Sequence, residues 1–98
     1  MPTLPKDPLW FRITETFVKS WDALPLKGTQ IIAANAAAAG ISRDDAKNSL
    51  AKAANAGIAT EHTALSPFRY SRTPRNELNK DQLALLKRID QARDELAA

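Results

Sequence analysis

Apolar side chains recur at helical spacing in the first quarter of the chain. Asp7-Pro8 provides an N-cap residue followed by a first-turn proline, so a helix is predicted to begin there. It should end near Ala23, because Leu24 precedes Pro25. An aromatic stripe at this spacing is typical of a hydrophobic core. The stripe consists of Trp10, Phe11, Ile13, Phe17, Val18 and Trp21.

The stretch from residue 31 to 58 contains two alanine-rich apolar runs that meet at Gly40-Ile41-Ser42. Thr29 is a plausible N-cap for a helix over residues 30–39, which Gly40 should end. Ser42 should open the next helix, with Asp45 three residues later as in a capping box. That helix should end at Gly57, with Ala46, Leu50 and Ala53 on its buried side.

Two short segments with strand-like composition follow. Residues 58–63 and 68–73 are separated by a turn at Leu65-Ser66-Pro67. The second segment alternates aromatic and basic side chains. The pair is therefore predicted to form a β-hairpin with a loop of about four residues.

The last segment predicts a helix that starts at Asn79 or Asp81 and runs through Ala98. Its apolar positions alternate at four- and three-residue spacing, as in a coiled-coil seam with one polar position. We favour pairing of this helix with that of a second copy, giving a homodimer. The alternative is that it folds back on Trp10 and Phe17. The seam residues are Leu78, Gln82, Leu85, Ile89, Ala92 and Leu96.

The composition is that of one small globular domain, with 98 residues, 44% of them hydrophobic, and no cysteine. The chain has no signal peptide pattern and no apolar run long enough to cross a bilayer, so a cytoplasmic protein is predicted. The net charge is +3. Residues 1–28, 29–75 and 76–98 have balances of +1, +3 and −1, so the positive excess lies in the central block, as expected for a protein that binds a polyanion.

Signatures of an enzyme are missing from the sequence. The only histidine is His62, and no metal-ligand spacing, glycine-rich phosphate loop or nucleophile elbow occurs. Asp44 and Asp45 are explained by helix capping and the helix dipole. We therefore predict no enzymatic activity, no catalytic residue, no metal and no cofactor. No small-molecule ligand is predicted either, although Trp10, Phe17 and Trp21 are available to line a pocket.

The spacing of small residues around Gly40 indicates two short helices that cross closely. Ala36 precedes this glycine by four residues and Ala46 follows it by six. With Leu50, the exit at Gly57-Ile58 and the basic hairpin strand, the pattern resembles the winged helix-turn-helix family of bacterial and phage DNA-binding regulators. The resemblance covers roughly residues 10–73. It implies a mainly α fold with a small β-hairpin, to which a C-terminal amphipathic helix is added.

In that family the second helix of the motif enters the major groove, and the wing, which is the β-hairpin, reaches the adjacent phosphates or the minor groove. The resemblance therefore implies that Arg43, Lys47 and Asn48 read base edges, with Asp44 on the same face as a possible acceptor from cytosine. The implied phosphate contacts are Lys52, Arg69, Arg72 and Gln30.

The predicted organisation is a flexible arm over residues 1–7, a winged helix-turn-helix domain over 8–75 and a dimerisation helix over 76–98. The expected function is sequence-specific binding of double-stranded DNA by a small dimeric transcriptional regulator. One alternative is a protein-interaction adaptor that uses the winged fold as a scaffold, since a fold does not fix a function. Another is a DNA-binding component of a plasmid or phage replication or partition system.

Overall fold

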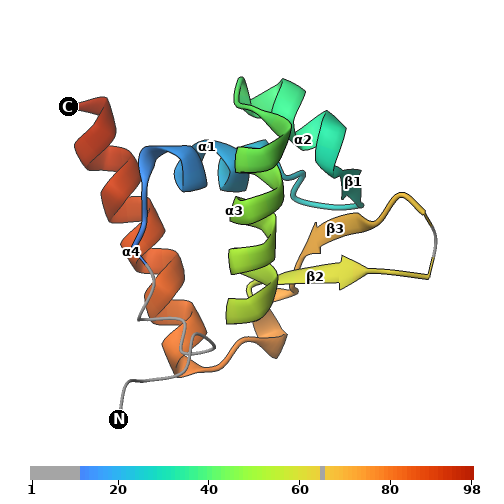
Figure 1. Ribbon diagram of the computed structural model, residues 1–98. Helices are drawn as coiled ribbons and strands as arrows, with labels where there is room; N and C mark the ends of the chain where they lie inside the picture. The colour runs from blue at the N-terminus through green and yellow to red at the C-terminus, as the bar shows by residue number, and fades with distance from the viewer. Residues whose placement is uncertain (1–11, 65) are drawn as a thin grey trace, which may run out of the picture.

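The computed structural model describes residues 12–64 and 66–98 (Figure 1). The protein is mainly helical, with a small three-stranded antiparallel sheet. In chain order its elements are α1 (Glu15–Ala23), β1 (Gln30–Ile31), α2 (Ile32–Ala39), α3 (Arg43–Ala56), β2 (Ala59–His62), β3 (Arg69–Arg72), the 3-10 turn η1 (Arg75–Glu77) and α4 (Lys80–Ala97).

The first helix is shorter than the sequence pattern predicts. Residues 12–14 are not helical, and α1 begins at Glu15 because the Thr14 hydroxyl accepts a hydrogen bond from the Phe17 N–H at 3.1 Å. A threonine at this position satisfies one of the free N–H groups of the first turn. The predicted end at Ala23 is confirmed. The predicted start at Asp7-Pro8, the arm over residues 1–7, Trp10 and Phe11 lie outside the described residues.

The prediction that Thr29 caps a helix beginning at Gln30 is wrong. Gln30 and Ile31 form β1, which pairs with Tyr70 and Arg69 of β3. The helix α2 starts at Ile32, two residues later than predicted, after an extended Ile31 that makes no side-chain capping bond. Pairing with β3 satisfies backbone groups that a helix would otherwise use, so a tertiary contact overrides the local helix preference.

The hairpin and the helix before it match the sequence pattern closely. Ser42 caps α3 through a 3.0 Å bond to the Asp45 N–H, and Gly57 ends it at a φ of +85°. The strands β2 and β3 lie within the two predicted segments, and the sheet order is β1-β3-β2. The predicted loop is too short, because the strands end at His62 and resume at Arg69.

The hydrophobic core joins α1, α3, the sheet and α4. Its members include Phe17, Trp21, Leu50, Ile58 and Tyr70, together with two residues of α4. In Figure 1, α4 lies on one side of α3 and the hairpin projects on the other. Within the described segments, no helix has the length and apolar character needed to cross a membrane.

The predicted dimer seam is wrong for two of its residues, because α4 packs on its own chain. Leu85 and Ile89 are 0% exposed and belong to the core that contains Phe17. Gln82 is also engaged, since its Nε2 donates to the Ala56 carbonyl at 3.1 Å. Leu78 also packs against the core, whereas Leu96 is 50% exposed. The apolar stripe of α4 therefore serves mainly to complete the fold.

Candidate nucleic-acid interface

The exposed face of α3 carries most of the residues predicted to contact DNA. Ala46, Leu50 and Ala53 are buried, which turns the opposite side of the helix toward solvent. Over residues 12–64 and 66–98, none of the basic residues on this face forms an ion pair with a carboxylate. Their charges are therefore available to an external anion. The predicted residues that are exposed here are Arg43, Asp44, Lys47, Asn48 and Lys52.

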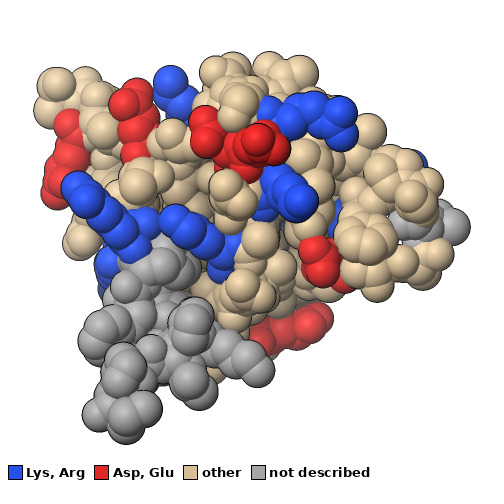
Figure 2. Space-filling view, viewed as in Figure 1, with Lys and Arg blue, Asp and Glu red and all other residues tan. Residues whose placement is uncertain are grey.

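Acidic groups interrupt the basic character of this face. Asp44 and Asp45 are exposed in the first turn of α3, where they complement the positive end of the helix dipole. Figure 2 shows acidic and basic side chains interleaved over α3, without a continuous basic patch. The mixture is suited to reading a pattern of donors and acceptors more than to strong attraction of any polyanion.

A shallow hollow connects the start of α2 with the start of α3. It has a volume of about 400 Å³ and is lined by Ile32, Arg43, Asp44 and Lys47. Ile32 is the first residue of α2, whose N-terminus makes no side-chain capping bond. The free N–H groups at a helix start attract anions. Two basic side chains of α3 therefore share one depression with an uncapped helix start.

Arg69 adds a basic side chain from the hairpin. It is exposed, and in the sheet register it lies opposite both Ile31, the residue before α2, and His62. The ring of His62 is hydrogen-bonded through Nε2 to the Ser71 hydroxyl at 2.7 Å. The pairing with Ile31 brings the hairpin next to the start of α2. The exposure of Arg69 is compatible with its predicted contact with phosphate, which stays a prediction.

The structure gives Arg72, which was predicted to contact phosphate, a role within the fold. Its guanidinium donates hydrogen bonds to the carbonyl oxygens of Trp21 (2.8 Å) and Leu24 (3.1 Å), at the C-terminal end of α1. It also lies 4.5 Å from the centroid of the Trp21 ring. Burial lowers the pKa of Arg72 from its ordinary value. Arg72 provides the positive charge that the last turn of α1 lacks, and it acts within the fold.

Gln30, which was also predicted to contact phosphate, likewise makes a contact within the fold. Its Oε1 accepts a 2.8 Å hydrogen bond from Asn35 Nδ2. The Asn35 amide is fully buried and also bonds to Ser20, accepting from the hydroxyl at 2.7 Å and donating to the carbonyl at 3.0 Å. This network joins α1, β1 and α2. Gln30 therefore helps to fix the helix that precedes the turn, and its predicted contact with phosphate gains no support from this arrangement.

The sequence did not single out Phe68 as a surface residue. It precedes β3 by one position and is 44% exposed, next to Arg69. Tyr70, two residues later, is buried within β3, whereas Phe68 lies outside the strand, which begins only at Arg69. Exposed aromatic rings near basic side chains are a common feature of surfaces that bind single-stranded nucleic acid, where unpaired bases stack on the rings. Alternation alone does not reveal it, since it assigns Phe68 and Tyr70 to the same side.

Among the described residues, no group of three or more histidine, cysteine or acidic side chains is placed to hold a metal ion. Comparison of the chain with protein-family models, curated proteins and solved structures finds no match.

Proposed function

We propose that the protein is a winged helix-turn-helix DNA-binding domain that places α3 in the major groove of double-stranded DNA. The observation that carries the proposal is the exposed, unpaired face of α3 within this topology. The order α1-β1-α2-α3-β2-β3, with the sheet order β1-β3-β2, is the arrangement expected of a winged helix. The Gly40 turn, at a φ of +69°, sets α2 against α3.

The α3 side chains suit base recognition. The major groove of B-DNA is about 12 Å wide and admits one helix. Arg43 and Lys47 fit the O6 and N7 acceptors of guanine, and Asn48 fits the N6 and N7 atoms of adenine. Asp44, on the same face, accepts from the N4 amine of cytosine. The acidic residue then contributes specificity by repelling sequences that offer no donor.

Backbone contacts are proposed for Lys52, Arg69 and the uncapped start of α2. Arg69 and the start of α2 are neighbours through the pairing with Ile31, and the hollow beside Ile32 leads on to Arg43 and Lys47. Phosphate contacts of this type fix the register of a protein on the duplex but carry little sequence information. The wing would thus orient α3 for the base contacts. A regulatory role and a role in replication or partition both fit this mode of binding.

The test begins with selection of bound sequences from random duplex DNA. Fluorescence anisotropy then measures affinity for the selected site and for an unrelated duplex at several salt concentrations. We expect Asn48→Ala to weaken the selected site by about 1–3 kcal/mol relative to the unrelated duplex. Arg69→Gln should weaken both duplexes and reduce the salt slope by about one.

Lys27→Gln is the matched control, because it removes one exposed charge from the loop before β1, away from the α3 face. It should leave both affinities unchanged. The proposal is refuted if no duplex binds at moderate salt. It is also refuted if Lys47→Gln and Arg69→Gln behave like Lys27→Gln.

The acidic start of α3 favours a second candidate, a docking surface for another protein. Asp44 and Asp45 are exposed beside Arg43 and Lys47, and Figure 2 shows the two charge types side by side. Such a mixture fits a complementary protein surface. Capture of a stoichiometric protein partner, lost in the Asp44→Lys variant, together with no affinity for DNA, would support this role over the first.

A further inference from the structure

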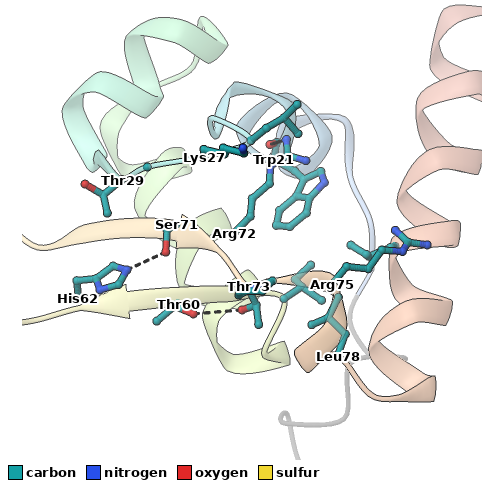
Figure 3. A pocket seen from close by; sticks show the side chains of 15 residues that line it. Trp21, Lys27, Thr29, Thr60, His62, Ser71, Arg72, Thr73, Arg75 and Leu78 are labelled. Carbon is teal, nitrogen blue, oxygen red and sulfur yellow. Dashed lines mark hydrogen bonds between the residues drawn. The ribbon is translucent and has the colours of Figure 1, made fainter.

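A hollow of about 730 Å³ lies beside the sheet. Strand residues including Thr60, His62 and Ser71 form one wall (Figure 3). The loop between α1 and β1 and the turn η1 contribute the flanks. The volume is in the usual range for small-molecule sites. Neither a residue of α3 nor Arg69 lines it, so it is distinct from the side chains proposed to contact DNA, although Ser71 in its wall belongs to the same strand as Arg69.

The interior of the hollow combines an apolar part with hydroxyl groups. Trp21, Leu78 and Leu86 supply apolar surface, and the described strands contribute serine and threonine side chains. Three of these hydroxyl groups already have partners, since Thr60 is hydrogen-bonded to Thr73 at 3.2 Å and Ser71 to His62 Nε2 at 2.7 Å. Most of the lining area is therefore suited to an apolar group, with hydrogen bonding at its edge.

Among the described residues, the charged groups that line the hollow are all basic. Lys27 and Arg75 are exposed, and Arg72 lies between the strand and the Trp21 ring (Figure 3). No aspartate or glutamate is among the lining residues described. Within residues 12–64 and 66–98, Arg72 donates only to neutral carbonyl oxygens, and its buried Nε has no hydrogen-bond partner. The positive charge around this cavity is therefore not balanced by direct ion pairs.

We infer that this hollow is a binding site for a small organic anion that carries an aromatic or aliphatic group. The apolar part would lie against Trp21 and Leu78, and the anionic group would face Lys27 and Arg75. A purely inorganic anion would leave the apolar lining uncovered, and an uncharged ligand would leave Lys27 and Arg75 without a partner of opposite charge. This site goes beyond DNA binding and does not depend on it.

The probe is 1-anilinonaphthalene-8-sulfonate, an aromatic anion, added to the folded full-length protein. Its binding is measured by its own fluorescence and by energy transfer from tryptophan. N-phenyl-1-naphthylamine, which is similar in shape and has no charge, is titrated in parallel. We expect the anion to bind at least tenfold more tightly than the uncharged compound.

Lys27→Gln and Arg75→Gln should each weaken binding of the anion about threefold, as expected for exposed charges, and leave binding of the uncharged compound unchanged. Thr60→Phe, which fills the hollow from an exposed strand position, should weaken binding of both compounds about tenfold. Lys47→Gln on α3 removes the same charge elsewhere and should have no effect. Near-ultraviolet circular dichroism verifies that each variant is folded.

The inference is overturned if the two compounds bind equally well. It is also overturned if Lys47→Gln weakens binding of the anion as much as Lys27→Gln does. The same holds if Thr60→Phe, Lys27→Gln and Arg75→Gln all bind the anion like the unsubstituted protein. These outcomes are independent of the DNA titrations. If the protein binds DNA but not the aromatic anion, only this inference fails. If it binds the anion but not DNA, only the proposed function fails.

Discussion

Gly57 is the point at which the end of α3 meets the start of α4. Its φ is +85°, and a Cβ added there would lie 2.2 Å from Gln82 Nε2 and 3.3 Å from Gln82 Cδ. The same amide donates to the Ala56 carbonyl at 3.1 Å and accepts from the Asn79 N–H at 2.8 Å. The substitution Gly57→Ala therefore strains the backbone and also displaces a side chain that caps α4 and ties it to α3.

The two effects can be estimated separately. A left-handed backbone costs an L-residue about 1–2 kcal/mol. Each hydrogen bond lost by the Gln82 amide costs about 0.5–1.5 kcal/mol. Two such bonds are at stake, so we expect Gly57→Ala to lower the free energy of unfolding by about 2–5 kcal/mol. Gly40→Ala is the matched control: its φ is +69°, no atom lies within 4 Å of the added Cβ, and only the backbone cost of about 1–2 kcal/mol applies.

The assay is urea denaturation followed by far-ultraviolet circular dichroism, for Gly57→Ala, Gln82→Ala, the double variant and Gly40→Ala. In the Gln82→Ala background the amide is already gone, so the cost of Gly57→Ala should fall to that of Gly40→Ala. The expected coupling between the two sites is about 1–3 kcal/mol, the contribution of the two hydrogen bonds of the Gln82 amide. An equal cost of Gly57→Ala in both backgrounds would refute the assigned contact between Gly57 and Gln82.

Three further predictions concern the interior. Asn35→Ala removes three hydrogen bonds of a buried amide and should cost about 2–3 kcal/mol in urea denaturation, whereas exposed Asn48→Ala should change stability by less than about 0.5 kcal/mol. Arg72→Gln should lower stability by about 1–3 kcal/mol without weakening the DNA affinity of the folded protein. Arg69→Gln should weaken DNA affinity and leave stability nearly unchanged. Equal losses of stability in the two variants would contradict the structural role given to Arg72. Burial, with the hydrogen bond to a carboxylate, raises the pKa of Tyr70 to about 12 from its ordinary 10.0. Tyr70 is the only tyrosine, so tyrosinate absorbance should show one transition near pH 12, and the stability that Tyr70 contributes should be complete below pH 10 and lost as the pH rises toward 12.

The helix α3 was predicted to the residue because its boundaries are set by local chemistry. The Ser42 hydroxyl and the Gly57 backbone act within their own turns, so their effect can be read from a short window of sequence. The buried stripe of Ala46, Leu50 and Ala53 follows from helical periodicity alone. The same holds for the exposure of Lys47 and Asn48, which is the opposite face of that helix.

The errors occur where distant segments compete for the same groups. The two residues of β1 have no strand signal of their own and become a strand because β3 offers a free edge. The heptad spacing of α4 does not distinguish a partner helix from the core of the same chain. Leu85 and Ile89 are buried by Phe17 and Trp21, which lie more than sixty residues earlier. Only the three-dimensional packing decides between these outcomes.

The different roles of Arg69 and Arg72 follow from their separation along β3. Successive side chains of a strand point to opposite faces, so residues three apart lie on opposite sides of the sheet. Tyr70 is buried, which places Arg72 on the core side and leaves Arg69 outside. The alternation was visible in the sequence, but only the burial of Tyr70 shows which face is the inner one.

The short strand β1 is what gives the proposed interface a fixed geometry. A two-stranded hairpin is marginally stable on its own, and β1 adds a third strand on the free edge of β3. Because Ile31 ends β1 and immediately precedes α2, its pairing with Arg69 fixes the hairpin relative to the start of that helix. The buried Asn35 then holds α2 against α1 and Gln30. Residues outside the proposed DNA contacts thus determine where Arg69 lies relative to α3.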